Sequence, residues 1–138
     1  MVLLEFGSNN CIFTLTEKTT ITNPDYIFVF VDDHTGKKYA CTATDISAYT
    51  SKYNKFNLIV GSSNIPLSGQ IGLVNYGFYH YYVYQSSDAS TFDYTNIDTT
   101  DLRTLTGLVE TGKMFYKGIA VTNNYYKDTR SSIKTYND

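Results

Sequence analysis

The chain has 138 residues, a net charge of −2 and no tryptophan. This length favours one domain whose hydrophobic core needs neither disulfides nor metal, and the nearly neutral charge argues against a dedicated nucleic-acid surface. Charged residues make up only 17% of the chain, whereas aromatic residues make up 16% and include 14 tyrosines. A surface rich in Tyr, Thr, Ser and Asn is typical of β-proteins and of proteins that contact other proteins.

The N-terminal residues, MVLLEFGSNN, form a short apolar run that Glu5 interrupts. They lack the regions that make up a signal peptide, and no apolar stretch approaches the length of a membrane helix. We therefore expect no membrane contact, and a protein that stays in the cytosol unless it leaves it within a larger particle.

Three strands are predicted within residues 11–44. Alternating residues predict strands at 11–16 and 37–44, and the unbroken apolar run 26–31 predicts a central strand covered on both faces. The loop 32–36 ends in glycine, so 26–31 and 37–44 are expected to pair as a hairpin. Residues 45–54 fit either one helical turn or a crossover loop.

A further strand is predicted at 55–60, and an aromatic segment follows. This segment, 69–85, reads GQIGLVNYGFYHYYVYQ, and its two-residue repeat predicts two strands joined by a tight turn at 75–77. Alternation divides the second strand into a face with Tyr79, Tyr81 and Val83 and a face with Phe78, His80, Tyr82 and Tyr84. One face can cover the core, and the other is either buried by a second layer or presented to a partner.

A long polar segment, 86–106, carries a few apolar anchors, namely Phe92, Tyr94, Ile97 and Leu102. Loops of this length are uncommon in compact domains unless they are functional or extend over a neighbour. The last predicted strand is 113–121, after which a polar tail retains Tyr125, Tyr126, Ile133 and Tyr136. We expect a β-sandwich domain at 1–121 and a C-terminal extension at 122–138.

The predicted fold is all-β, because short strands alternate with turns along the whole chain. Gly77, Tyr79, Tyr81 and Val83 match a pattern that recurs in immunoglobulin-like sandwiches, although the cysteine and tryptophan of antibody domains are missing. We expect an antiparallel, immunoglobulin-like β-sandwich of about seven or eight strands with a long polar loop and an extended C-terminal tail.

No catalytic motif accompanies the two histidines. His34 lies in a turn and His80 in an aromatic strand, and the chain has neither a G-x-S-x-G motif nor another recognisable nucleophile with an orienting acid. We expect no enzymatic activity and no small-molecule substrate.

The acidic residues and the cysteines give no metal-binding pattern. Asp32 and Asp33 adjoin in a hairpin loop, and the group Asp93 to Asp101 has neither EF-hand nor nonapeptide-repeat spacing. Cys11 and Cys41 fit buried, reduced side chains, although the sequence leaves open whether they pair. We expect no cofactor and no metal.

Four lysines lie near tyrosines in the sequence, an arrangement that would suit single-stranded nucleic acid. They are Lys37, Lys38, Lys52 and Lys55, beside Tyr39, Tyr49 and Tyr53. The net charge opposes nucleic-acid binding, and lysine on edge strands protects sheets from aggregation. We therefore expect the second role, and no nucleic-acid partner.

The ordered set of motifs carries a family resemblance. The pieces 15–60, 65–85 and 107–118 contain L-T-E-K-T, an Asn-Pro before an apolar strand, Y-N-K-F, G-x-I-x-L, G-x-Y-x-Y-x-V-Y and V-E-T-G-K. In this order they resemble small virion structural proteins of tailed bacteriophages, most of all those of crAss-like phages and other phages of Bacteroidetes hosts.

The resemblance implies a non-enzymatic building block, assembled in the host cytoplasm into the virion as an auxiliary capsid or head-to-tail ring protein. Its partners would be copies of itself and the capsid, portal or tail proteins. The expected contact residues are Phe78, His80, Tyr82, Tyr84, Phe92, Tyr94, Tyr125, Tyr126, Ile133 and Tyr136. The alternative is a carbohydrate- or receptor-binding β-sandwich on a phage fibre or tail, which the absence of tryptophan disfavours.

Overall fold

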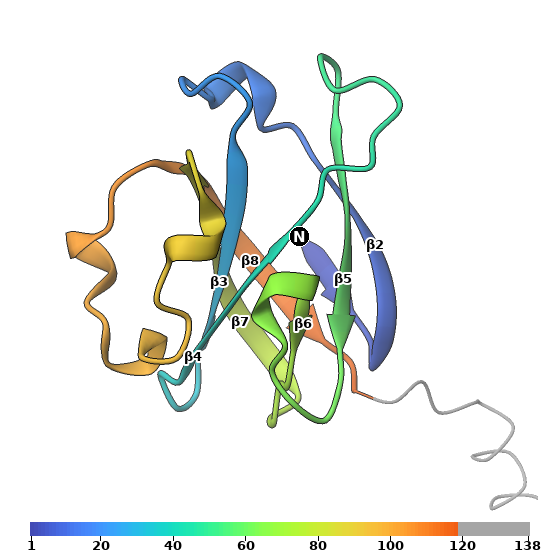
Figure 1. Ribbon diagram of the computed structural model, residues 1–138. Coiled ribbons are helices and arrows are strands. Elements are labelled where there is room, and N and C mark those ends of the chain that lie inside the picture. Colours follow the sequence, from blue (N-terminus) through green and yellow to red (C-terminus); the bar gives the residue numbers. More distant parts are fainter. Residues whose placement is uncertain (119–138) are drawn as a thin grey trace, which may run out of the picture.

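The computed structural model describes residues 1–118, which form two facing β-sheets (Figure 1). Within them the chain has eight strands, five short 3-10 helices and no α-helix. The larger sheet has the order β1 (Val2–Leu4), β8 (Leu108–Tyr116), β7 (Gly77–Ser86), β3 (Asp25–Asp32), β4 (Lys38–Ala43). The smaller sheet has the order β2 (Gly7–Phe13), β5 (Asn54–Val60), β6 (Gln70–Ile71).

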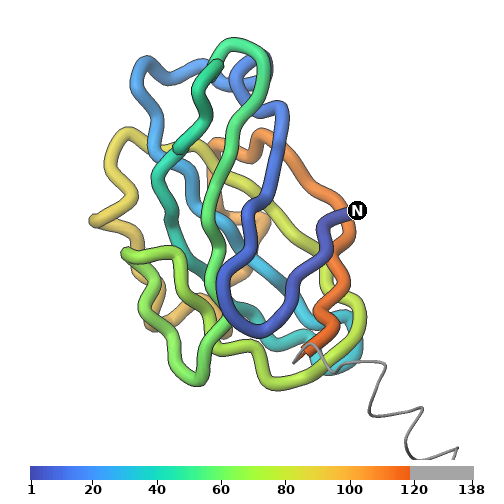
Figure 2. The backbone as a smooth tube through the Cα atoms, turned by 90° about the vertical axis from the view of Figure 1, so that its right-hand side faces the viewer, coloured from blue at the N-terminus to red at the C-terminus, as the bar shows by residue number. Residues whose placement is uncertain are grey.

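The fold is therefore mostly β, as predicted, but both sheets are mixed. β1 pairs with β8 and β5 pairs with β6 in parallel, while the other pairs are antiparallel. In Figure 2 the antiparallel pair β2–β5 lies in front of the larger sheet, with the β1–β8 edge at one side. The predicted domain boundary after residue 121 lies outside the described residues.

Aromatic rings from both sheets fill the space between them. Phe56 of β5 lies 4.8 Å from Phe28 of β3 and 6.0 Å from Phe13 of β2, measured between ring centroids. Phe28 and Phe56 are fully buried, and these rings meet at tilted or edge-on angles, which aromatic pairs prefer. The three rings join the smaller sheet to the larger one.

β3 and β4 form the predicted hairpin, and hydrogen bonds to the Asp32 side chain stabilise its turn. The buried Asp32 carboxylate accepts hydrogen bonds from the backbone N–H of His34 at 2.8 Å and from the Asn75 side chain at 2.9 Å. Burial by itself raises the pKa of Asp32, but the hydrogen bonds from Asn75, His34 and Thr35 outweigh burial and hold this pKa below its usual value. The charged carboxylate thus connects the hairpin to the turn before β7.

The predicted pairing within residues 69–85 is wrong. β6 pairs with β5 in the smaller sheet, whereas β7 lies between β3 and β8 in the larger sheet. The turn near Asn75 therefore carries the chain from one sheet to the other. Turn residues indicate where a chain reverses, but the choice of sheet depends on contacts distant in sequence.

β1 was not predicted, and the bounds of two other strands differ from the predictions. β2 covers Gly7–Phe13 instead of 11–16. β8 covers Leu108–Tyr116, whereas the predicted strand 113–121 begins later and its last residues lie outside the described part of the chain. Residues 44–53 form an irregular connection without a helix, which is the crossover-loop alternative. Gly112 weakens the strand signal in β8, yet the position requires glycine, because a Cβ there would lie 2.7 Å from the ring of the Tyr81 side chain.

Candidate interaction surface

The long polar segment 86–106 packs on the outer face of the larger sheet. It contains three 3-10 turns, η3 (Ala89–Thr91), η4 (Ile97–Thr99) and η5 (Leu102–Thr104), and lies beside β3 and β4 in Figure 1. Ala89 and Ile97 are buried in a second apolar cluster with Ile27, Val29, Ala40 and Tyr84; Phe92, Tyr94, Leu102 and Leu105 pack against it. The anchors recognised in the sequence thus contact the sheet of their own chain.

Aspartates fix the turns of this segment. Asp88 accepts a hydrogen bond from the backbone N–H of Ser90 at 3.0 Å, and Asp101 accepts one from Arg103 at 3.0 Å. Asp98 accepts one from the backbone N–H of Lys38 at 2.9 Å, which ties the segment to β4. Among residues 1–118, no group of three or more His, Cys, Asp or Glu side chains is arranged to hold a metal ion.

Replacing Ile97 by alanine is expected to lower the free energy of unfolding by about 2 kcal/mol, because the side chain is buried beneath the segment. Urea denaturation followed by circular dichroism measures this change. Thr99→Ala, at an exposed position of the same turn, is the control and is expected to change stability by less than about 0.5 kcal/mol. Equal stability of the Ile97→Ala variant and the wild type would contradict the packing of the segment on its own sheet.

The segment covers one half of the outer face and leaves the other half open. Of the predicted aromatic face of β7, Tyr84 is buried and Tyr82 packs partly against the second cluster, whereas Phe78 is 49% exposed and His80 is partly exposed. The predicted face is therefore divided between a covered end and an open end. Four other expected contact residues, Tyr125, Tyr126, Ile133 and Tyr136, lie outside the described residues.

The open end forms an apolar corner made of Leu3, Phe115 and Phe78. Leu3 pairs with Phe115 and Phe115 pairs with Phe78, so the three side chains form one row across β1, β8 and β7. Leu3 is 55% exposed, and the rings of Phe78 and Phe115 lie 4.9 Å apart. Of these three residues only Phe78 was predicted as a contact residue, because β1 was not predicted and the row to which Phe115 belongs depends on the strand register.

Charged side chains border the apolar corner. The carboxylate of Asp33 receives a hydrogen bond from the His80 ring and lies 3.3 Å from the Lys113 ammonium, which also lies 5.3 Å from the centre of the Phe78 ring. The hydrogen bond from His80 is the largest cause that lowers the pKa of Asp33; burial opposes it, and the hydrogen bond from Lys113 adds to the lowering, so that this pKa stays below its usual value. An apolar centre with a polar rim is the composition of a protein contact surface.

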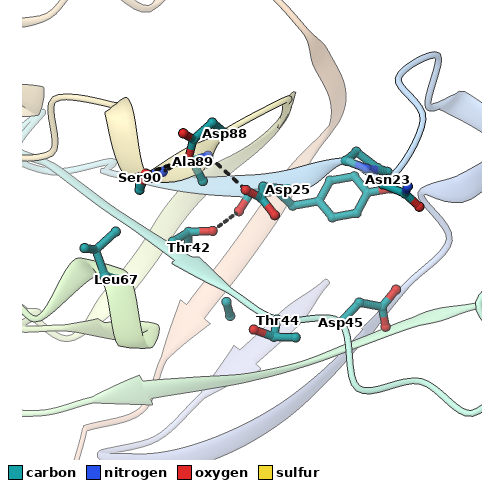
Figure 3. Close-up of a pocket in the computed structure, with 12 residues that line it drawn as sticks. Asn23, Asp25, Thr42, Thr44, Asp45, Leu67, Asp88, Ala89 and Ser90 are labelled. Carbon is teal, nitrogen blue, oxygen red and sulfur yellow. Dashed lines mark hydrogen bonds between the residues drawn. The ribbon is translucent and has the colours of Figure 1, made fainter.

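A polar cavity of about 540 Å³ lies between β3, β4 and the start of segment 86–106 (Figure 3). Its carboxylates hold loops in place. Asp25 accepts a hydrogen bond from the backbone N–H of Ala89 at 3.0 Å, and Asp45 accepts one from the side chain of Asn54 at 2.7 Å. These hydrogen bonds explain the positions of the two carboxylates.

Of the four lysines considered for nucleic-acid binding, Lys37 and Lys38 lie at the opposite end of β4 from Lys55. Lys37 and Lys38 lie at the start of β4, with the Lys37 ammonium 5.5 Å from the centre of the Tyr39 ring. The backbone N–H of Lys55 donates a hydrogen bond to the carboxylate of Asp45 at 3.1 Å, and Asp45 lies just after the other end of β4.

No described helix is long and apolar enough to cross a membrane.

Both cysteines are buried and free. Burial raises the pKa of the Cys11 thiol to about 11 and that of the Cys41 thiol to about 12, and a thiol must ionise to react.

Neither cysteine is therefore expected to react with Ellman's reagent at pH 8 in the folded protein, and both are expected to react in denaturant. The absorbance of the released thiolate measures the number of reacted thiols. Rapid reaction of a thiol in the native protein would contradict this environment.

Comparison of the chain with protein-family models, with curated proteins and with solved structures gave no match.

Proposed function

We propose that the protein is a non-enzymatic structural component of a tailed bacteriophage virion, acting as an auxiliary capsid or head-to-tail ring protein. The ordered motifs in 15–60, 65–85 and 107–118 support this proposal through their resemblance to virion proteins. The observation that carries it is the apolar corner, in which two exposed side chains and one partly buried ring lie within a charged rim.

The proposed role of the protein is to hold neighbouring subunits of the particle together. Burial of Leu3 and Phe78 against another virion protein would remove apolar area from water, which stabilises association. A symmetric particle repeats such a contact, so that modest contacts add up to a stable assembly. The proposed partners are copies of this chain and other virion proteins, and the proposed location is the virion.

We also propose that the two sheets form an immunoglobulin-like β-sandwich. Two facing sheets with an aromatic core support it. The parallel pairs β1–β8 and β5–β6 depart from the antiparallel arrangement of that fold.

The proposal is tested in particles produced by a phage that encodes the chain. Mass spectrometry of purified particles is expected to detect the protein in many copies, and cryo-electron microscopy is expected to locate it in the shell or at the head–tail junction. Absence of the protein from infectious particles would refute the proposal.

A second candidate function is binding of a carbohydrate or receptor, with the chain on a fibre or tail. The polar cavity favours it, because hydroxyl, amide and carboxylate groups of Thr42, Asn23 and Asp25 line a space of about 540 Å³. Binding of the isolated protein to a glycan array, lost in Asn23→Ala, would support this function over subunit adhesion.

A further inference from the structure

We propose that, in the free protein, residues 119–138 of the same chain bind over the apolar corner formed by Leu3, Phe78 and Phe115. This inference concerns the isolated chain and does not depend on the proposed role in a virion.

The chain already covers the other half of the same face in this way. Residues 86–106 bring widely spaced apolar side chains onto the sheet, while Ser, Thr, Asp and Asn fill the positions between them. Residues 119–138 have the same kind of composition, with Ile119, Val121, Tyr125, Tyr126, Ile133 and Tyr136 separated by polar residues. A second segment of this type matches an open apolar surface that the first segment leaves uncovered.

The point where the described chain ends lies beside the apolar corner. Lys117 donates a backbone hydrogen bond to the carbonyl of Leu4 at 2.9 Å, and Phe6 donates one to the carbonyl of Gly118 at 2.9 Å. These bonds fix the chain only three residues beyond Phe115, in register with the strand that carries Leu3. The described chain therefore ends at Gly118, three residues beyond the Phe115 of the corner.

Gly118 gives the chain a change of direction at this point. Its φ is +77°, a conformation that favours glycine, and a Cβ at this position would lie 2.6 Å from the ring of Tyr76. At Gly118, two residues after the end of β8, the backbone therefore departs from the extended conformation of the strand.

The distances allow the contact. Three neighbouring strands span about 10 Å between the outer strand axes, since adjacent strands lie about 4.8 Å apart. Twenty residues can reach about 60 Å when extended, so the segment is several times longer than the corner is wide. A turn of a few residues followed by one extended stretch suffices to cross it.

Attachment to the same chain favours this occupant over a second copy. A tethered segment has an effective concentration in the millimolar range near its own exit point, far above the concentration of a dilute partner.

Limited digestion of the full chain with trypsin tests the proposal, because Lys127, Arg130 and Lys134 are cleavage sites within the segment. Cleavage there is expected to be about tenfold faster in Leu3→Ser and in Phe78→Ser than in the wild type, since cleavage follows the population of the undocked segment. Leu108→Ser is the matched control: Leu108 is 51% exposed, similar to Leu3, but it lies at the other end of β8. Its cleavage rate is expected to equal that of the wild type.

A second measurement uses the unaltered chain and needs no variant. A short lysine-specific cross-linker is expected to join Lys127 or Lys134 to Lys113 or Lys117 within the monomer, as read by mass spectrometry of the monomer band. Both the cross-link yield and the protection from trypsin are expected to be independent of protein concentration. Equal cleavage rates in all variants together with an absence of these cross-links would overturn the proposal. Protection that increases with protein concentration would also overturn it, and would assign the corner to a second copy.

Discussion

Replacing Phe56 by alanine is expected to lower the free energy of unfolding by about 3–5 kcal/mol, the range for deletion of a buried aromatic ring. Phe56 is fully buried, and its ring lies within 6.0 Å of the rings of Phe13, Tyr26 and Phe28. Its removal leaves a cavity where the two sheets meet, and the neighbouring rings cannot fill that cavity without leaving their preferred rotamers. Urea denaturation followed by circular dichroism measures the loss.

The control for this variant is Ile12→Ala on β2, because the Ile12 side chain is 63% exposed. The control is expected to change stability by less than about 0.5 kcal/mol. A similar loss in the two variants would show that the Phe56 ring does not join the sheets.

Replacing Asn54 by alanine is expected to cost about 3 kcal/mol, because two backbone N–H groups lose their acceptor. Asn54 is buried, with 2% of its surface exposed. Its side-chain oxygen accepts hydrogen bonds from the backbone N–H of Leu15 at 2.7 Å and from that of Thr16 at 3.2 Å. Its amide also donates to Asp45 at 2.7 Å. The side chain therefore holds two loops against the start of β5, and thermal or urea unfolding measures the effect.

Asn57→Ala provides the matched control for Asn54→Ala. Asn57 lies on the same strand, but its side chain accepts a hydrogen bond only from the exposed hydroxyl of Ser8 among the described contacts. We expect a change of less than about 0.5 kcal/mol. If the two asparagine variants lose the same stability, the buried hydrogen bonds of Asn54 do not contribute as argued.

The sequence predicted those parts of the fold that depend on neighbours along the chain. The apolar run of β3, the glycine-containing turn and the alternation of β4 are all local, and the hairpin that they predict is present. β6 and β7 have equally clear local signals, yet β6 belongs to the smaller sheet. The pairing of β6 with β5 depends on how the two sheets pack against each other. The residues of a turn carry no information about that packing.

The candidate surface was predictable only in part for the same reason. Alternation in β7 placed Phe78 and Tyr84 on one face, but segment 86–106 buries Tyr84 and leaves Phe78 open. The partners of Phe78 in the apolar corner come from β8 and β1, and that row depends on the parallel register of the two strands. Register between segments more than 100 positions apart leaves no short-range pattern in the sequence.

The pairing of β1 with β8 also determines when folding can finish. The two strands stand at opposite ends of the described chain, so their parallel ladder closes a loop of nearly the whole domain. Loop closure of this kind costs entropy before any contact compensates for it, and topologies rich in distant pairings fold in milliseconds to seconds. On the ribosome, the larger sheet can be completed only after β8 has left the exit tunnel, so β1 waits unpaired through most of synthesis.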